Sequence, residues 1–409
     1  MDRRTPLSPV DFCFTGHDAY AVEFGLYFPY ALDADRLRAA LDRTVASFWP
    51  VAATLETDRE AGYCLVPRPE PLDFRELPAT DGVPDWRNPQ SLVPFATTIV
   101  SAPGEALARF RLARCGAGSF FVANVSHCVV DGYSFFFFLS ALAAQYRSSR
   151  FSLERAKLAL LKPDCDRTKL RASAVDIDRS PHRTAVDADD VLARTGIAYA
   201  EPRVLPKPGS SQWEFYRFAD EELSAWLKAA ETETTIRISR HDVLAATLWK
   251  RIGESWHRSG EQLSLSSAFD YRRVAKALSP TYFGNAIRAA AAFFDRDELL
   301  QAPLGKVAER IRRATAAIDE AAVQASLACM TELRRLHGTA VPVRLHVSHP
   351  RTGFLVTNLS RVPRQELDFG QGPPEMLVPL TAAPRSAVVL PGTDGVEVRL
   401  ELPATAEGR

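Results

Sequence analysis

The sequence predicts a mixed α/β fold in two halves, each a mixed sheet flanked by helices. The chain has 409 residues, more than one hydrophobic core usually supports. Segments of helical and of strand periodicity occur on both sides of a central stretch, residues 162–211. That stretch is charged and aperiodic, then rich in Pro, Gly and Ser, which is typical of a crossover loop. We therefore expect two domains, at 1–161 and 212–409, joined by this loop.

The composition is that of a folded protein, and it excludes several functional classes. Hydrophobic residues make up 46% of the chain and charged residues 24%, which argues against disorder. The 50 Lys and Arg residues balance 50 Asp and Glu residues, so no overall charge would attract nucleic acid or an anionic membrane. The most apolar run, residues 135–144, is too short to cross a bilayer. We expect neither nucleic acid nor a membrane as a partner.

The cysteines and histidines form no metal-binding or disulfide pattern. No CxxC pair occurs among the six cysteines, and His346 and His349 have no cluster of Cys, Asp or Glu beside them. The first 14 residues also lack the apolar stretch of a secretory signal. We therefore expect no metal site, and we interpret the cysteines as buried thiols of a cytoplasmic protein.

The N-terminal half contains one predicted helix, several strands and a second helix. In residues 33–49 apolar side chains recur at three- and four-residue spacing, which predicts a helix capped by Asp33. Short apolar or alternating segments predict strands, namely GYCLVP, LVPFATTIV, ALARFRLARC and residues 119–126. Residues 133–147 then have the length and the Ala and Leu content of a helix. Residues 127–132 therefore connect a strand to a helix.

The C-terminal half begins with two predicted helices and ends in strands. The helices are FADEELSAWLKAAETE and SRHDVLAATLWKRIGES, and Ser239 and Asp242 match a capping-box spacing at the start of the second. The segment FLVTNLS predicts a buried strand. In GVEVRLELP, four apolar residues alternate with Glu397, Arg399 and Glu401, and Asp394-Gly395 marks the turn before it.

The loop at 127–132 places His127 and Asp131 in an otherwise apolar segment. A neutral imidazole at the end of a strand can take a proton from a hydroxyl or amine that attacks a carbonyl. Asp131 could orient the imidazole, or it could pair with an arginine and hold the loop; we favour the second role. The spacing alone is weak evidence, because an Asp four residues after one of eight histidines is expected by chance roughly once in two such proteins. A buried histidine with no catalytic role is the alternative.

Five segments resemble landmarks of one enzyme family. SHCVVDG resembles the HxxxDG motif of the BAHD superfamily of CoA-dependent acyltransferases, which is related to chloramphenicol acetyltransferase and to peptide-synthetase condensation domains. Four other segments resemble further landmarks in the family's order, namely FWPVAATLE, RISRHDVLAATLW, FDYRRVAKALSPTYFGNA and LDFGQGPPE. The closing PGTDGVEVRLEL resembles the family's final hairpin. The resemblance therefore covers nearly the whole chain.

This resemblance implies two chloramphenicol-acetyltransferase-like domains with a solvent channel between them that reaches His127 from both faces. Acyl-CoA would enter from one side as co-substrate, and a small-molecule acceptor from the other. His127 would act as the general base of a direct transfer, with no covalent acyl-enzyme and no permanently bound cofactor. We expect the enzyme to act as a monomer.

The resemblance also implies roles for other residues. Asp368 would pair with Arg272 and tie two distant segments together, while Gly370 and Gly372 suit a loop with unusual dihedral angles. Ser239 would lie beside the pantetheine arm, although a helix cap is its more usual role. The remaining residues are the motif glycine and two candidate oxyanion ligands, namely Gly132, Thr357 and Asn358.

Two departures from the family pattern concern tryptophans, which are replaced here by Gln371 and Leu359. They weaken inference about the acceptor more than inference about the reaction. One alternative is a condensation-like enzyme that takes its acyl group from a carrier protein, but Ser126 stands where such domains usually have a first histidine. A non-catalytic relative that binds a small molecule is the other alternative.

Overall fold

Nine consecutive buried residues make β7 (Gly118–Ser126) the centre of the first sheet. This sheet has the order β14-β2-β7-β6-β5, in which only β5 and β6 run parallel among neighbours. Its other strands are β14 (Met376–Pro379), β2 (Ala21–Phe28), β6 (Ala108–Cys115) and β5 (Asp73–Thr80). The computed structural model describes residues 4–148, 162–172, 186–204, 212–254, 261–381, 383 and 385–402.

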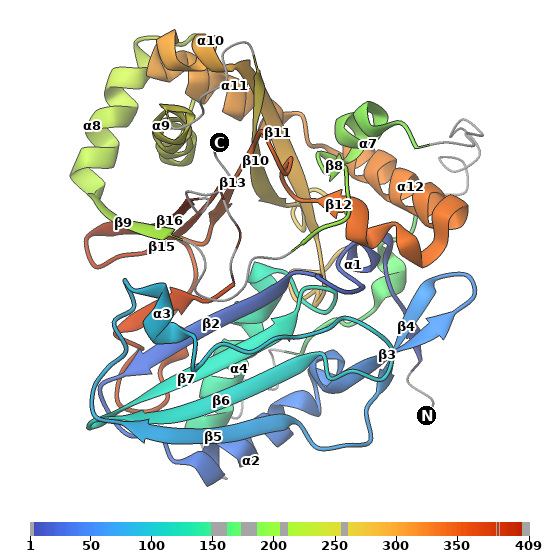
Figure 1. Cartoon of the computed structure of the whole chain (residues 1–409), viewed down its shortest axis with the longest axis vertical. Coiled ribbons are helices and arrows are strands. Elements are labelled where there is room, and N and C mark those ends of the chain that lie inside the picture. The colour runs from blue at the N-terminus through green and yellow to red at the C-terminus, as the bar shows by residue number, and fades with distance from the viewer. Residues whose placement is uncertain are drawn as a thin grey trace.

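Two helices cover one face of this sheet. The helices α2 (Ala34–Val45) and α4 (Gly132–Arg147) pack together below it (Figure 1). Side chains alternate across a strand, so Phe24 of β2 points at Phe135 and Phe136 of α4, whereas Glu23 points to the opposite face. Asp33 accepts a hydrogen bond from the backbone of Arg36, as the predicted cap of the first helix. The face of the first sheet that carries Glu23 is turned toward the second sheet.

The second sheet has the order β11-β10-β13-β15-β16-β9. Its helices lie on the outer face (Figure 1). The strands are β11 (Ile287–Asp295), β10 (Gln262–Asp270), β13 (Gly353–Asn358), β15 (Ser386–Pro391), β16 (Gly395–Leu402) and β9 (Gln212–Ala219). The helices are α8 (Asp220–Glu231), α9 (Arg240–Glu254), α10 (Arg296–Gln301) and α11 (Leu304–Ala316). The predicted mixed α/β class is therefore confirmed.

Smaller elements lie beside the two sheets. They are β1 (Thr5–Pro6), β4 (Gly62–Pro67) and β3 (Ala53–Asp58), which form one sheet; β8 (Ala198–Tyr199) and β12 (Leu345–His346), which form a pair; and the helices α1 (Pro9–Phe12), α3 (Pro89–Leu92), α7 (Ala188–Thr195) and α12 (Glu320–His337). Short 3-10 turns complete them, namely η1 (Trp49–Ala52), η2 (Arg167–Lys169), η3 (Gly338–Ala340), η4 (Pro342–Arg344) and η5 (Arg364–Leu367).

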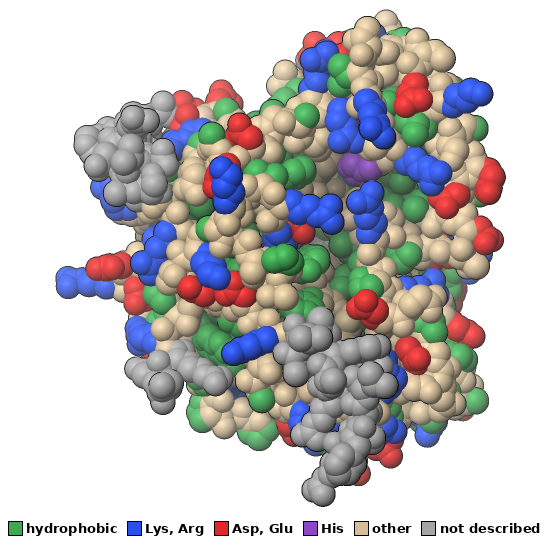
Figure 2. Space-filling model, turned by 180° about the vertical axis from the view of Figure 1, so that it is seen from behind, with side chains coloured by type: hydrophobic (Ala, Val, Ile, Leu, Met, Phe, Trp, Pro, Cys, Tyr) green, Lys and Arg blue, Asp and Glu red, His purple; other side chains and the backbone are tan. Residues whose placement is uncertain are grey.

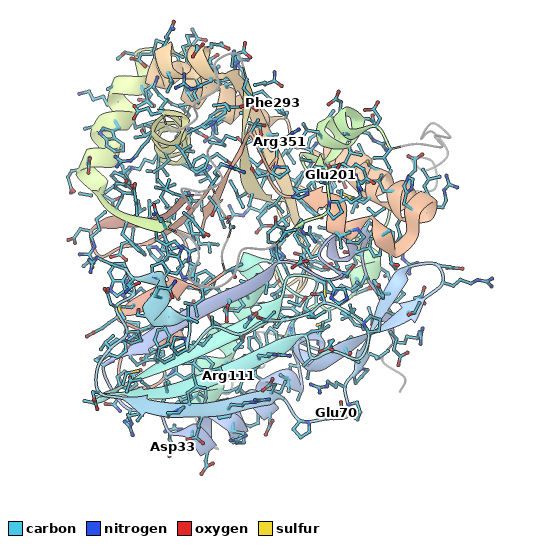
Figure 3. All side chains as sticks on the ribbon, in the orientation of Figure 1. Asp33, Glu70, Arg111, Glu201, Phe293 and Arg351 are labelled. Atoms are coloured by element: carbon cyan, nitrogen blue, oxygen red, sulfur yellow. The ribbon has the colours of Figure 1, made fainter. Side chains whose placement is uncertain are left out.

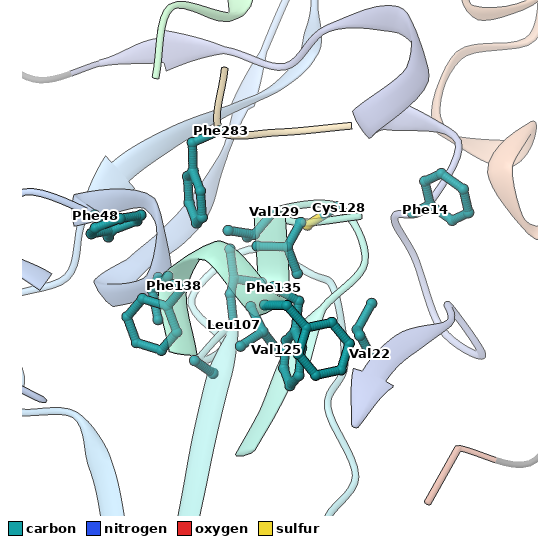
Figure 4. Packing of buried hydrophobic residues seen from close by; sticks show 14 of the residues in the cluster. Phe14, Val22, Phe48, Leu107, Val125, Cys128, Val129, Phe135, Phe138 and Phe283 are labelled. Carbon is teal, nitrogen blue, oxygen red and sulfur yellow. The ribbon is translucent and has the colours of Figure 1, made fainter. Parts of the chain in front are cut away.

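The chain crosses between the halves more often than the expected boundaries suggest. The strand β14 comes from the C-terminal half but pairs with β2 in the first sheet. Phe283 likewise enters the N-terminal core, where its ring packs edge-on against Phe48 at 5.0 Å beside Val129 (Figure 4). The expected crossover loop contains η2, α7 and β8, and two parts of it, residues 173–185 and 205–211, lie outside the described residues.

The strand predicted for LVPFATTIV, residues 92–100, is wrong. Asn88 caps the short helix α3 just before it, and the residues that follow Pro94 form no sheet strand. Instead, the N–H and the hydroxyl of Thr97 donate to one carboxylate oxygen of Glu23, at 2.8 and 3.1 Å. The backbone therefore bonds to a side chain of the sheet rather than extending the sheet.

The polar side of β16 is buried rather than solvated. Arg399 and Glu401 are only 3% and 0% exposed, and they form an ion pair at 3.2 Å. Arg399 also donates to the carbonyl oxygens of Pro379 and Thr381, the latter at 2.8 Å. This side of the strand faces the first sheet, so its charges fasten β14 to the second sheet.

Glu23 is the other buried acid between the sheets, and it sets a pH-dependent stability. Burial raises the pKa of Glu23 to about 7, although the Thr97 N–H and hydroxyl oppose this shift. The folded protein therefore keeps a proton that the unfolded chain releases near pH 4.5, and the free energy of unfolding falls as the pH rises through that window.

We predict that Glu23→Gln stabilises the protein by up to about 3 kcal/mol at pH 8 and by less than about 1 kcal/mol at pH 5. The neutral amide keeps the shape of the side chain but carries no charge to bury. Urea unfolding of both proteins at the two pH values measures the difference. An equal effect at both would show that Glu23 is already ionised in the fold.

Candidate functional site

Three consecutive backbone amides of the C-terminal half donate to side chains of the N-terminal half. The Gly284 N–H bonds to Ser134 Oγ at 3.0 Å. The next amide, of Asn285, bonds to Asp11 Oδ1 at 3.1 Å, and the amide of Ala286 bonds to Asp131 Oδ2 at 2.9 Å. This contact brings segments far apart in the sequence to one place, directly beside His127.

His127 follows the last residue of β7 and is partly exposed. Its backbone N–H donates to the Tyr20 carbonyl at 3.1 Å, which continues the pairing of β7 with β2 by one residue. Its ring stacks on Phe14, with ring centres 4.0 Å apart and planes inclined by 14°. The sheet thus fixes the backbone of His127 and Phe14 covers one face of its ring.

The hydrogen bonds of Asn285 identify the protonated nitrogen of His127. Asn285 Nδ2 donates to the His127 carbonyl and to Asp11 Oδ1, both at 2.7 Å. Two acceptors fix which end of the amide carries the hydrogens, so Asn285 Oδ1 is the atom that lies 3.1 Å from His127 Nδ1. An oxygen there requires Nδ1–H. His127 Nε2 therefore carries the free lone pair, as a general base needs.

Burial also keeps the His127 ring neutral. Removal from water lowers its pKa below the usual 6.5, while the nearby Asp131, Asn285 and Asp11 act in the opposite direction. The net shift is downward. Most of the imidazole is therefore uncharged at neutral pH and able to accept a proton.

A buried ion pair supports Asn285 from behind. Asp11 Oδ1 also accepts from Arg167 at 2.9 Å, and both side chains are fully buried. Arg167 donates a second bond to the Val129 carbonyl at 2.9 Å, within the loop that follows His127. The guanidinium compensates the carboxylate charge, so Asp11 can hold the amide of Asn285 without carrying an unpaired charge.

Asp131 holds the loop and does not touch the imidazole. It caps α4 through the Ser134 N–H at 2.9 Å, and its two oxygens contact Arg272 at 3.0 and 2.8 Å. Burial alone would raise the pKa of Asp131, but Arg272 and the backbone donors hold that pKa below its usual range. Asp131 thus stays ionised as the partner of an arginine.

The expected pair of Asp368 with Arg272 is wrong. Arg272 is taken by Asp131 and by Asp270, the latter at 3.1 Å. Asp368 Oδ1 accepts instead from the amides of Gly370 and Gly372, at 2.6 and 2.8 Å. Both glycines have positive φ, at 122° and 112°, which lets the turn fold back on the carboxylate. Asp368 therefore stabilises its own turn rather than joining distant segments.

The end of β13 lies against the start of α4. A Cβ atom at Gly132 would come within 2.9 Å of Leu359 Cδ2, so a larger residue there would have to displace this methyl group. Asn358 Nδ2 lies 3.0 Å from His241 Nδ1 in the first turn of α9, while Thr357 makes no side-chain hydrogen bond to any described residue. The structure thus brings Gly132 and the 357–359 segment together.

Ser239 caps α9, as its sequence spacing predicts. Its hydroxyl and its N–H both donate to Asp242 Oδ2 at 2.7 Å, and Arg312 of α11 binds the same oxygen. The cap orients the first turn of α9, which carries His241. No hydrogen bond joins Ser239 to His127 within the described ranges.

The surface is hollowed on the side opposite to the view of Figure 1. Figure 2 shows a histidine side chain in this hollow, with Lys and Arg side chains around it. A separate pocket of about 570 Å³ is lined by Arg4, Trp49 and residues of the 162–168 segment, and not by His127. The expected channel with two entrances stays a prediction.

Within the part of the chain that the structure describes, no group of three or more His, Cys, Asp or Glu could hold a metal ion. In the same residues, no helix is both long and apolar enough to span a membrane.

Sequence reasoning missed Asn285, Asp11 and Arg167. Asn285 lies in the YFGNA segment that carries the resemblance, but nothing in the sequence pairs it with His127, which is 158 residues away. Asp11 had a usable signal, because Ser8 and Asp11 have the same capping-box spacing as Ser239 and Asp242, and the box is formed. Arg167 was assigned to the crossover loop.

Comparison with known proteins gives a consistent family. The model of the family described as "Transferase family" matches residues 6–406. Putrescine hydroxycinnamoyltransferase 1 of Oryza sativa subsp. japonica is 28% identical over 391 residues, which are 90% of this chain and 82% of that protein. Shikimate O-hydroxycinnamoyltransferase of Nicotiana tabacum is 24% identical, over 86% of this chain and 80% of that protein.

Solved structures share the fold over nearly the whole chain. TRI101 of F. sporotrichioides, in complex with coenzyme A and T-2, superposes with a TM-score of 0.72 at 18% identity, covering 98% of this chain and 95% of that one. Vinorine synthase superposes with a TM-score of 0.67 at 17% identity, covering 98% of this chain and 90% of that one. The first condensation domain of the CDA synthetase gives 0.57 at 17% identity, with 97% and 90% covered.

The different partners of the two motif aspartates predict different mutational effects. Asp131→Asn should destabilise the protein by about 3–5 kcal/mol, because it removes the buried one of the two carboxylates that pair with Arg272 and leaves the half-exposed Asp270 alone. Asp368→Asn should cost less than about 1.5 kcal/mol, since Asn can still accept from the two glycine amides. Denaturant unfolding measures both. An equal loss of unfolding free energy in the two variants would support the Asp368–Arg272 pair after all.

Proposed function

Because the chain belongs to the Transferase family, we propose that it transfers an acyl group from acyl-CoA to a small-molecule acceptor, with His127 as general base. The acceptor group is a hydroxyl, or less readily an amine. The observation that carries this proposal is the Asn285 contact, which leaves His127 Nε2 unprotonated. The named relatives and the CoA-bound TRI101 complex support acyl-CoA as the donor.

The proposed reaction is a direct transfer. His127 Nε2 takes the proton from the acceptor hydroxyl as its oxygen attacks the thioester carbonyl carbon. The carbonyl π electrons move to oxygen and give a tetrahedral oxyanion. When the oxyanion collapses, the C–S bond breaks and the thiolate takes the proton back from His127. One residue thus serves as base and then as acid, and both substrates bind at once.

Of the two oxyanion candidates, Thr357 is favoured over Asn358. The Asn358 amide is engaged on both sides, with His241 at 3.0 Å and with the Ser360 N–H at 3.0 Å. The hydroxyl of Thr357 makes no bond to a described residue and lies two residues before Leu359, which packs on Gly132. It is therefore available to donate to developing negative charge. Ser239 acts only as a cap for the helix beside this strand.

The proposed setting is the cytoplasm, and the proposed active form is a monomer. No disulfide joins the six cysteines, which all lie in the described residues, and this suits a reducing compartment.

Incubation with a panel of acyl-CoAs and acceptors tests the function through thiol release and product mass. A parallel assay with acyl groups on a carrier protein separates the CoA-dependent reaction from a condensation-like one. Product with acyl-CoA alone supports the proposal, while product with carrier protein alone contradicts the assigned donor.

We predict that His127→Ala lowers acyl transfer by about 10³-fold or more while the melting temperature stays nearly unchanged. The wild-type kcat/KM should fall on the acid side with a midpoint below pH 6.5, because the neutral ring is the active form and its pKa is lowered. Initial rates across pH measure the loss of activity and the midpoint, and thermal unfolding measures the melting temperature. Normal turnover by the variant would eliminate the mechanism.

Asn285→Ala should lower kcat by about 100-fold with a small change in KM, because the ring can then adopt the wrong tautomer and orientation. The acid limb of its pH profile should move to lower pH, since Asn285 raises the His127 pKa. A loss of rate with an unmoved acid limb would assign Asn285 a purely structural role.

A further inference from the structure

The aromatic ring of Phe14 is a buried group to which the proposed mechanism gives no role. Only 2% of Phe14 is exposed, and within the described residues its one aromatic contact is the stack on the His127 ring, with ring centres 4.0 Å apart. Figure 4 shows the Phe14 ring apart from the rings of Phe135 and Phe138, on the segment that joins α1 to β2. The stacking partner of Phe14 is thus the imidazole and not another phenylalanine.

The turn that carries Phe14 also carries Asp11. The Phe14 N–H donates to the Asp11 carbonyl at 3.1 Å, so the backbone of the two residues keeps a fixed spacing. The Asp11 carboxylate holds Asn285, which in turn lies 3.1 Å from His127 Nδ1. Residues 11–14 therefore support the imidazole in two ways, at its Nδ1 edge through Asn285 and on one face through the phenyl ring.

We propose that Phe14 is a positioning residue for His127, and that the reactants meet Nε2 from the ring face opposite Phe14. This inference rests on the proposed function, in which His127 is the base. A hydrogen bond at Nδ1 alone lets the imidazole tilt about that bond, whereas a flat ring stacked on one face fixes its plane. Both supports together hold the lone pair of Nε2 in one direction, which a general base requires.

The same stack removes one face of the imidazole from water. Burial is the largest influence on the pKa of His127, and it lowers that pKa. The charged groups around the ring form two pairs, Asp11 with Arg167 and Asp131 with Arg272. A substitution at position 14 leaves all four charges in place, so it changes the cover of the ring and not the charges around it.

Substitution of Phe14 by leucine tests the proposal, because it removes the flat ring and keeps an apolar side chain. We expect Phe14→Leu to lower kcat by about fivefold or more and to change KM by less than about twofold, since a misaligned base affects the transition state more than binding. The titration midpoint of His127 should rise from below 6.5 toward 6.5, because water then reaches the ring. NMR of isotope-labelled histidine without substrates measures the midpoint, and the spectrum of His127→Ala identifies the signal.

Two other phenylalanines provide matched controls. Phe12→Leu makes the same change within the same turn, in a ring that is 1% exposed and contacts Tyr63 rather than His127. Phe293→Leu makes it in β11, an edge strand of the second sheet (Figure 3). Both controls should leave kcat and the His127 midpoint unchanged.

An unchanged kcat with an unchanged midpoint in Phe14→Leu would overturn the proposal. Equal changes in Phe12→Leu would also overturn it, because they would come from lost packing in the turn. Urea unfolding shows first that each variant is folded. Where Phe14→Leu does not fold, Phe14→Met takes its place with the same expectations, since methionine is apolar and adapts to the space that the ring leaves.

The NMR titration needs no acyl donor, so it separates this proposal from the proposed function. Failure to release thiol from any acyl-CoA would overturn the proposed function, while a raised midpoint in Phe14→Leu would still show that Phe14 governs the imidazole. Thiol release with the same kcat and midpoint in wild type and Phe14→Leu would leave the function standing and remove the role of Phe14.

Discussion

The docking of residues 284–286 onto the N-terminal half is the constraint on which the site depends. Each of the three amides meets a different side chain, and two of these are buried carboxylates. Asp11 and Asp131 are both fully buried, and each pairs with its own arginine, Arg167 and Arg272. Because each carboxylate is paired with an arginine, the two negative charges can hold the backbone segment 284–286 next to His127. The site therefore exists only where both halves meet.

The histidine and the aspartate of the HxxxDG motif are close in sequence but bind different parts of the C-terminal half. His127 is oriented by Asn285, 158 residues away, while Asp131 binds Arg272, 141 residues away. The aspartate acts on chemistry only by fixing the loop and capping α4. Gly132 lies against a third partner, because a Cβ atom there would come within 2.9 Å of Leu359 Cδ2 of the C-terminal half. Each of these three motif positions thus contacts a different partner.

The sequence predicts local structure better than partners. Periodicity located α2, α4, α8 and α9, and the S-x-x-D spacing located the cap at Ser239, because these features depend on residues within a few positions. The prediction that Asp368 pairs with Arg272 was wrong. Charge alone does not tell which of several carboxylates an arginine binds, and in the fold Asp131 lies next to Arg272. The strand at 92–100 failed because Thr97 bonds to Glu23, which no local pattern shows. Arg167 was missed because a charged, aperiodic segment looks solvated until its arginine is found buried.

An amide between His127 and the buried carboxylate has a specific consequence. If Asp11 contacted the imidazole directly, its charge would raise the pKa of the ring and hold a proton on it at neutral pH. Asn285 stands between Asp11 and the ring: Nδ2 bonds to the carboxylate, and Oδ1 fixes Nδ1–H, so the upward effect of the Asp11 charge on the His127 pKa stays smaller than the downward effect of burial. The proposed base is therefore oriented and still uncharged, which the removal of a proton from a hydroxyl requires. Arg167 pairs with the same carboxylate, so a residue of the crossover segment takes part in holding Asn285, and through it the imidazole, in place.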